Sequence, residues 1–98
     1  MDAFAKPETG FKGLDFRINQ SLKMYGYHNL MGYITGNQDR ARFMSYADGS
    51  IRFDEDAKLA GWTREIKVKD EIAYNRMEQL IALMMTIPGC PVIFYGDE

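Results

Sequence analysis

One amphipathic stretch, from about Asp70 to Ile87, constrains the fold of this chain more than any other feature of the sequence. Its apolar residues recur at i, i+4, i+7, i+8, i+11 and i+14, the spacing that lines one face of an α-helix. Asp70 can accept hydrogen bonds from the free backbone N–H groups at the start, and Pro88 forces Ile87 out of helical geometry at the end. The pattern predicts a helix over 70–87 whose apolar face is made of Ala73, Met77, Leu80, Ile81, Met84 and Ile87.

Two short apolar segments on either side of this helix predict strands. Leu30 to Thr35 lies between Asn29 and Gly36, and Val92 to Tyr95 follows Pro91, whose missing N–H is tolerated at the first position of a strand. Both segments are apolar throughout, as in parallel strands that are covered on both faces. Strand, helix and strand in this order predict a right-handed βαβ crossover.

The rest of the chain is expected to hold one more long helix and one long connection. Leu14 to Tyr25 has apolar residues on one helical face and is followed by Gly26, which suits a helix C-terminus. Asp2 to Ala5 is expected to be the tail of a helix, followed by a loop. From Arg40 to Lys69 no period is sustained, so an irregular connection is predicted. Loops above ~15 residues are uncommon in compact domains unless they bind or cover something.

Composition excludes several classes of protein. With 98 residues the chain holds one domain at most, and 12 Lys and Arg against 14 Asp and Glu give a net charge of -2 without a basic run that could follow a nucleic acid. The longest apolar run, Leu80 to Met85, is far too short to span a membrane. The single cysteine, Cys90, cannot form an intrachain disulfide and is expected to be a buried apolar residue. The first ten residues lack the apolar region of a secretory signal.

The predicted βαβ unit is incomplete on its own. Parallel strands that are apolar on both faces need neighbouring strands at each edge and helices over the sheet. We therefore expect residues 1–98 to be a piece of a larger α/β protein and to need the remainder of that protein for folding. Alone, the chain is expected to aggregate or to remain partly disordered, because it exposes both sheet edges and much apolar helix surface.

Carboxylates follow both predicted strands. In α/β folds, function gathers at the carboxyl ends of parallel strands, because the loops there converge. Asp39 follows the first strand, and Asp97 and Glu98 follow the second, so these acids are expected around one rim. Taken alone, an Asp just after a strand is more often a turn or cap residue than a catalyst.

Two segments of the chain have the form of known motifs: residues 33–43, YITGNQDRARF, and residues 88–98, PGCPVIFYGDE. The first resembles the strand-7 motif of the α-amylase family of glycoside hydrolases, and the second is similar to that family's strand-8 segment. The helix predicted over 70–87 occupies the expected place between them. The resemblance implies a (β/α)8 TIM barrel, of which residues 1–98 form part of the catalytic domain: helix 6, strand 7, helix 7 and strand 8.

The resemblance also implies an activity, the hydrolysis of α-glucosidic bonds in starch or maltooligosaccharides with retained configuration. A retaining glycosidase needs a carboxylate nucleophile and a carboxylic acid that lie ~5 to 5.5 Å apart. The transition state of its reaction resembles an oxocarbenium ion. By resemblance, Asp39 is a third, catalytic carboxylate that stabilises this transition state. Gln38 stands where the family usually has His, and Gln can hydrogen-bond a hydroxyl but cannot carry a positive charge. The substrate-binding positions that the resemblance implies are Asn37, Gln38, Arg42 and Asp97.

No segment of the chain matches the family's nucleophile or acid/base motifs, so the chain alone is expected to be inactive. The alternative is a non-catalytic, α-amylase-like protein that binds carbohydrate or serves as an accessory subunit. The resemblance implies no cofactor in this segment and allows Ca²⁺ in the complete enzyme. The run Asp54-Glu55-Asp56 lacks the alternating spacing of a calcium loop and is expected to be a solvated acidic face. The sequence does not fix the location, and a secreted or periplasmic one follows from the resemblance alone.

The remaining candidates each have a structural and a functional interpretation. His28 precedes the first strand, where a surface or packing role is expected. Trp62 and Tyr46 lie in the long connection, where an aromatic ring could stack on a sugar or pack onto the domain. Filling the core is the role expected of Met77, Met84 and Met85.

Overall fold

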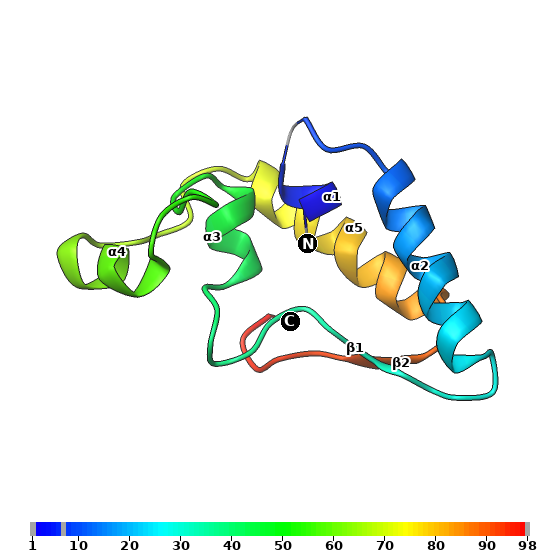
Figure 1. Ribbon diagram of the computed structural model, residues 1–98. Helices are drawn as coiled ribbons and strands as arrows, with labels where there is room; N and C mark the ends of the chain where they lie inside the picture. The colour runs from blue at the N-terminus through cyan, green and yellow to red at the C-terminus, as the bar shows by residue number, and fades with distance from the viewer. Residues whose placement is uncertain (1, 7, 98) are drawn as a thin grey trace.

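The computed structural model describes residues 2–6 and 8–97, which form five helices and two strands (Figure 1). The longest helix, α5, runs through the middle of the molecule, with the short helices α1 and α3 beside its first half and the strands across its other side. A second long helix, α2, faces α5 and the first strand across a cavity of about 220 Å³. The elements are α1 (Asp2–Ala5), α2 (Lys12–Tyr25), β1 (Gly32–Ile34), α3 (Phe43–Ala47), α4 (Ala57–Thr63), α5 (Ile72–Thr86) and β2 (Cys90–Val92).

Helix α5 forms where the sequence predicts it. The Asp70 carboxylate accepts a hydrogen bond of 3.0 Å from the Ile72 N–H, as expected of a residue at a helix start. Met85 is 55% exposed, so the expectation that it fills the core is wrong. No helix within residues 2–6 and 8–97 has the length and apolar character needed to cross a membrane. The core that α5 forms with α1 and α3 consists of Ala5, Phe43, Ala47, Ala73, Met77, Leu80 and Met84.

The sheet consists of β1 and β2 paired in parallel, as the order of strand, helix and strand predicts. The position of the second strand differs from the prediction, because β2 occupies Cys90–Val92 instead of 92–95 and Pro91 is its middle residue. A proline is tolerated there since, within the part of the chain that the structure describes, β2 pairs along one edge only. The register sets Gly32 opposite Cys90, Tyr33 opposite Pro91 and Ile34 opposite Val92.

The turn from α5 into β2 requires glycine at position 89. Gly89 has a φ of +148°, a conformation that other residues rarely adopt. A Cβ atom at this position would lie 2.8 Å from the carbonyl oxygen of Met31 and would overlap the ring of Tyr33. The next residue, Cys90, donates a hydrogen bond of 2.9 Å from its N–H to the same Met31 carbonyl. The start of β2 therefore lies directly against the residues that lead into β1.

The connection between β1 and α5 is more regular than predicted, since it contains α3 and α4. Helix α4 begins at Asp56, whose carboxylate accepts hydrogen bonds from the N–H groups of Lys58 at 2.9 Å and Leu59 at 3.1 Å. It projects away from the rest of the molecule (Figure 1), and Trp62 on it is 89% exposed. Helices of 5 and 7 residues make two turns or fewer, which is too short for a periodic pattern to reveal them.

The expectation of a (β/α)8 TIM barrel fragment is wrong for this structure. Helices make up 47% of the described residues, beside one two-stranded parallel sheet, and these residues do not show the expected pattern of barrel strands and helices. Each strand has three residues, and side chains expected to be covered on both faces are open, with Ile34 56% and Val92 42% exposed. Helix α2 has no buried residue, so it does not form the closely packed layer that a barrel needs.

Candidate functional site

Parallel pairing places the segments that follow β1 and β2 at the same end of the sheet. A buried hydrogen bond joins them, because the hydroxyl of Thr35 donates to Oδ2 of Asp97 at 2.7 Å. Only 2% of Thr35 and 7% of Asp97 is exposed. We call this region, residues 35–42 and 94–97, the strand-end site.

Arg42 strengthens the link between the two segments. Its Nη1 atom donates to Oδ1 of Asp97 at 3.2 Å and to the carbonyl oxygen of Tyr95 at 2.6 Å. Its guanidinium lies 4.6 Å from the ring centre of Phe94 and 4.8 Å from that of Tyr95, distances at which a cation is attracted to an aromatic ring. Both carboxylate oxygens of Asp97 are therefore engaged, and its buried charge is paired with a cation.

Gly96 lets the chain turn back so that Asp97 reaches the end of β1. Its φ is +78°, which glycine adopts without strain. The N–H of Asp97 donates to the carbonyl oxygen of Phe94 at 3.1 Å and closes the turn. The carboxylate that follows this glycine is thereby directed toward Thr35 and Arg42.

The segment between Thr35 and Arg42 contains a turn that exposes Asp39. The side-chain oxygen Oδ1 of Asn37 accepts a hydrogen bond of 3.1 Å from the Asp39 N–H, the local bonding typical of Asn in turns. Asn37 is half-buried, whereas Gln38 and Asp39 are exposed. Within residues 2–6 and 8–97, neither the Asp39 carboxylate nor the Gln38 amide has a hydrogen-bond or ion-pair partner.

The predicted site residues thus gather at one end of the sheet in two different environments. Asn37, Gln38 and Asp39 present polar groups near solvent, whereas Arg42 and Asp97 bond to each other. Glu98, which was also expected at this rim, lies outside the described residues.

Sequence reasoning missed the bond between Thr35 and Asp97. The two residues are 62 positions apart, and no periodicity or spacing connects them. The one local signal is Gly96, which marks a turn before the second acid.

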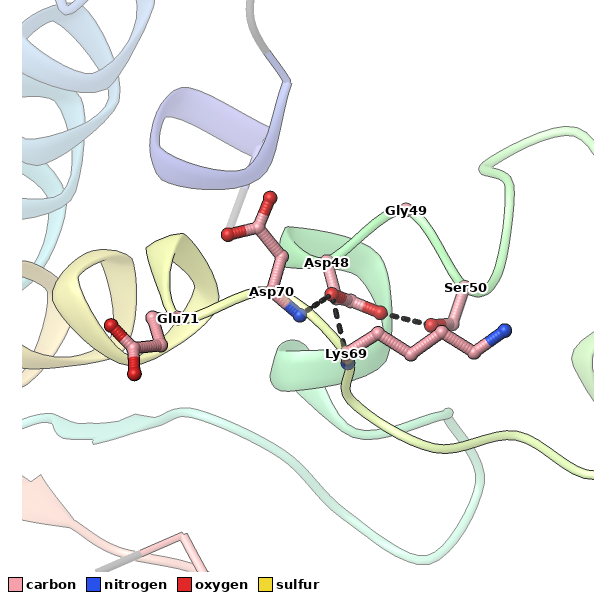
Figure 2. A pocket seen from close by; sticks show the side chains of 6 residues that line it. All are labelled: Asp48, Gly49, Ser50, Lys69, Asp70 and Glu71. Carbon is pink, nitrogen blue, oxygen red and sulfur yellow. Dashed lines mark hydrogen bonds between the residues drawn. The ribbon is translucent and has the colours of Figure 1, made fainter.

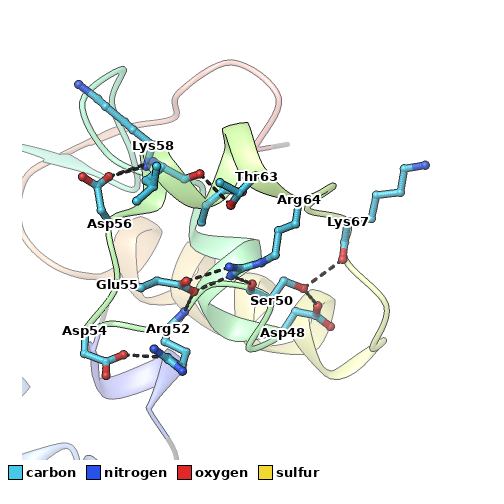
Figure 3. Close-up of polar contacts among 12 residues, drawn as sticks. Asp48, Ser50, Arg52, Asp54, Glu55, Asp56, Lys58, Thr63, Arg64 and Lys67 are labelled. Carbon is cyan, nitrogen blue, oxygen red and sulfur yellow. Dashed lines mark hydrogen bonds and ion pairs between the residues drawn. The ribbon is translucent and has the colours of Figure 1, made fainter.

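In the acidic run at 54–56, Asp54 and Asp56 are exposed, as predicted, whereas Glu55 is half-buried, and each of the three carboxylates has a partner (Figure 3). Glu55 accepts hydrogen bonds from Nη2 and Nη1 of Arg64 at 2.6 and 2.9 Å and from the Arg52 N–H at 2.7 Å. These bonds, the Arg64 contact first, lower the pKa of Glu55 to about 2. Asp54 pairs with the Arg52 guanidinium at 3.0 Å, and Asp56 caps α4. In the described part of the chain, no group of three or more His, Cys, Asp or Glu could hold a metal ion.

A second polar cluster, around Asp48, joins the end of α3 to the start of α5 (Figure 2). Oδ1 of Asp48 accepts hydrogen bonds from the backbone N–H groups of Lys69 at 3.2 Å and Asp70 at 2.7 Å, and Oδ2 accepts one from the Ser50 hydroxyl. The Ser50 bond is the largest cause of a lowered pKa of Asp48, and the backbone bonds add to it. Since both carboxylate oxygens of Asp48 are bonded within the protein, the cluster holds the end of α3 against the start of α5.

The remaining candidate residues from the sequence differ in their burial. Tyr46 stacks on Phe53 with ring centres 4.8 Å apart and packs against the core, so its packing interpretation is confirmed. Trp62 does not pack in this way, since it is 89% exposed. Cys90 is exposed, which corrects the expectation of a buried thiol, because among the described residues β2 is a short strand that pairs with β1 alone. His28 is exposed, in agreement with a surface role.

Comparison of the chain with known protein families, with curated proteins and with solved structures gives no match. A functional proposal therefore depends on the geometry of the strand-end site and on the motifs at 33–43 and 88–98.

Proposed function

We propose that this chain is a segment of a glycoside hydrolase that resembles the α-amylases and acts on α-glucosidic bonds of starch or maltooligosaccharides. In this proposal, the strand-end site is a surface that contacts the sugar. The observation that carries the proposal is the Asp39 carboxylate, which is exposed, has no partner among the described residues and sits on a turn beyond β1. The motif around Asp39 supports the same function.

A carboxylate in this position suits a sugar in two ways. It accepts hydrogen bonds from ring hydroxyl groups, and its negative charge stabilises the positive charge that develops in an oxocarbenium-like transition state. The bond of 3.1 Å from the Asp39 N–H to Asn37 restrains the backbone, so the carboxylate meets the sugar from a defined direction. Gln38 beside it adds an amide that both donates and accepts hydrogen bonds without adding charge.

Asp39 alone does not suffice for a retaining hydrolysis. That reaction needs a nucleophile and an acid roughly 5 to 5.5 Å apart. The other described carboxylate of the strand-end site, Asp97, is buried and bonded through both oxygens, so it serves in neither role. We therefore expect the nucleophile and the acid/base on other parts of the enzyme, and we expect this chain alone to bind glucan without cleaving it. A non-catalytic accessory protein would contact glucan in the same way.

Titration of the ¹⁵N-labelled chain with maltoheptaose, followed by NMR, tests the sugar contact. We expect the largest chemical-shift changes at residues 36–42. Asp39→Asn should raise the dissociation constant about tenfold, because hydrogen bonds to a charged acceptor become bonds to a neutral one. Asp54→Asn is the matched control, since Asp54 is an exposed acid in a different part of the chain.

Cellohexaose controls for the linkage, because its glucose units are joined by β-bonds, and we expect it to cause no changes at 36–42. Equal maltoheptaose affinities for the unmodified chain and Asp39→Asn, or no shifts at all in this segment, would contradict the proposed contact. Release of reducing sugar from starch by the chain alone would contradict the assignment of the nucleophile and acid/base to other parts of the enzyme.

A further inference from the structure

The segment that bears Asp39 is tied at both ends to one carboxylate. Thr35 precedes the segment and donates to Oδ2 of Asp97 at 2.7 Å, and Arg42 follows it and donates to Oδ1 at 3.2 Å. We infer that Asp97 is a positioning residue that fixes residues 36–41, and that Arg42 acts through Asp97 instead of contacting substrate. We call Thr35, Arg42 and Asp97 the Asp97 clamp.

Burial distinguishes this pair from the exposed ion pairs of the chain. The Asp97 side chain is 2% exposed, whereas in the pair of Arg52 with Asp54 the two side chains are 73% and 76% exposed. Exposed pairs contribute little, because water replaces the lost partner. A buried carboxylate that loses a partner keeps an uncompensated charge away from solvent. Breaking the clamp therefore leaves a buried Asp97 carboxylate to which water cannot readily donate hydrogen bonds.

Arg42 is itself held by contacts that a simple ammonium group would not reproduce. The same Nη1 atom that bonds Asp97 also donates to the Tyr95 carbonyl at 2.6 Å. The guanidinium lies near the rings of Phe94 and Tyr95, and this planar group can stack on aromatic faces while it donates hydrogen bonds. The position of Arg42 is therefore fixed relative to the segment that follows β2.

The clamp also joins the two strands at the end where their loops emerge. Thr35 directly follows β1, and Asp97 is positioned beyond β2 by the turn at Gly96. Gln38 and Asp39 lie between the two anchored ends of residues 36–41. The consequence for sugar binding rests on the proposed function, whereas the clamp itself rests on the bonds described above.

Backbone ¹⁵N order parameters of the 98-residue chain test the clamp. In Arg42→Gln and in Asp97→Asn, we expect the order parameters of residues 36–41 to fall from the ~0.85 of rigid backbone to below ~0.6, while those of α5 stay unchanged. Thr35→Val removes one hydrogen bond and keeps the ion pair, so it should cause a smaller loss in the same segment. It serves as the second variant if either of the others folds poorly. Arg52→Gln, which breaks an exposed ion pair, should leave residues 36–41 unchanged.

The double variant distinguishes a clamp from two independent contributions. Because Arg42 and Asp97 act through each other, combining Arg42→Gln with Asp97→Asn should lower the order of residues 36–41 no further than the more damaging single change. Unchanged order in the single variants, additive losses in the double variant, or an equal loss throughout α5 would each overturn the inference.

Maltoheptaose affinity is a separate measurement on the same samples. If the unmodified chain binds the sugar, Arg42→Gln should weaken binding about tenfold, through the loss of order near Asp39. Absence of binding to the unmodified chain would contradict the proposed function, and the order parameters would still decide whether the clamp exists.

Discussion

At the scale of single residues, Glu55 shows how one carboxylate can hold a long connection together. It accepts two hydrogen bonds from Arg64 and one from the Arg52 N–H, and Arg64 also donates to the Ser50 carbonyl at 2.9 Å. The side chain of Glu55 is 16% exposed. All three bonds favour the ionised carboxylate, which is why the pKa lies at about 2. The end of α4 is thereby attached to the loop that precedes it.

The lowered pKa of Glu55 predicts a dependence of stability on pH. The folded value of about 2 lies below the ordinary 4.5, so this stabilisation is complete above pH 4.5 and is lost as the pH falls from there toward 2. Glu55→Gln should therefore lower the urea midpoint at pH 6 and have little effect near pH 2, measured by circular dichroism at 222 nm. Asp54→Asn, which removes an acid from an exposed ion pair, should change the midpoint less at pH 6. A constant offset between Glu55→Gln and the unmodified chain across this range would contradict the prediction.

The position of the acids at the strand-end site could be predicted from the sequence, but the different environments of these acids could not. Asp39 and Asp97 each follow an apolar segment, and that order alone places them at one end of a parallel sheet. The bonds that separate an exposed acid from a buried one arise between segments far apart in the chain. Spacing within either segment contains no information about them.

At the scale of elements, long periodic segments were predictable and short ones were not. The face of α5 was predicted because its period is sustained over 15 residues, and α2 ends at Tyr25 as Gly26 indicates. An apolar run after a proline correctly predicted a strand near the end of the chain, but the position of β2 differs from the prediction. Pairing with β1 decides which three residues form the strand. Helix α4 begins at the Asp56 cap, whereas α3 has no side-chain cap and is held by packing of Phe43 and Ala47 in the core.

The buried face of α5 predicts different costs for two methionines on the same helix. Met77 is 5% exposed and belongs to the core, whereas Met85 is 55% exposed. Met77→Ala should lower the free energy of unfolding by about 2 to 4 kcal/mol, because it leaves a cavity, and Met85→Ala by less than about 0.5 kcal/mol. Urea unfolding of both variants checks this difference. Similar losses for the two would mean that α5 does not bury the face described.

At the scale of the whole molecule, local patterns did not determine the architecture. The two strands pair and the helices form, yet the sheet of the described residues has two strands and leaves apolar side chains uncovered. The barrel expectation assumed that these strands are covered on both faces, and Leu30, 73% exposed, and Ile34 show that within the described residues they are not. Closure of a sheet depends on neighbouring strands, and no pattern inside a short segment encodes their presence.

The open sheet predicts self-association in solution. Exposed apolar residues on short strands with free edges favour contacts between copies. We expect the weight-average sedimentation coefficient to rise with protein concentration, and Ile34→Lys to reduce this rise. Leu59→Lys is the control, since Leu59 is 61% exposed but lies on α4. A monomer at every concentration with a sharp cooperative melt would contradict the prediction.

The position of Trp62 on the projecting helix α4 determines how the folding of this chain can be observed. It is the single tryptophan of the sequence and is 89% exposed, so its indole is surrounded by water before any unfolding begins. Its fluorescence maximum should therefore lie at long wavelength and shift little when the core is lost, even though acrylamide quenches it strongly throughout. A thermal scan that records the wavelength of the tryptophan emission maximum would therefore stay nearly flat while the core melts.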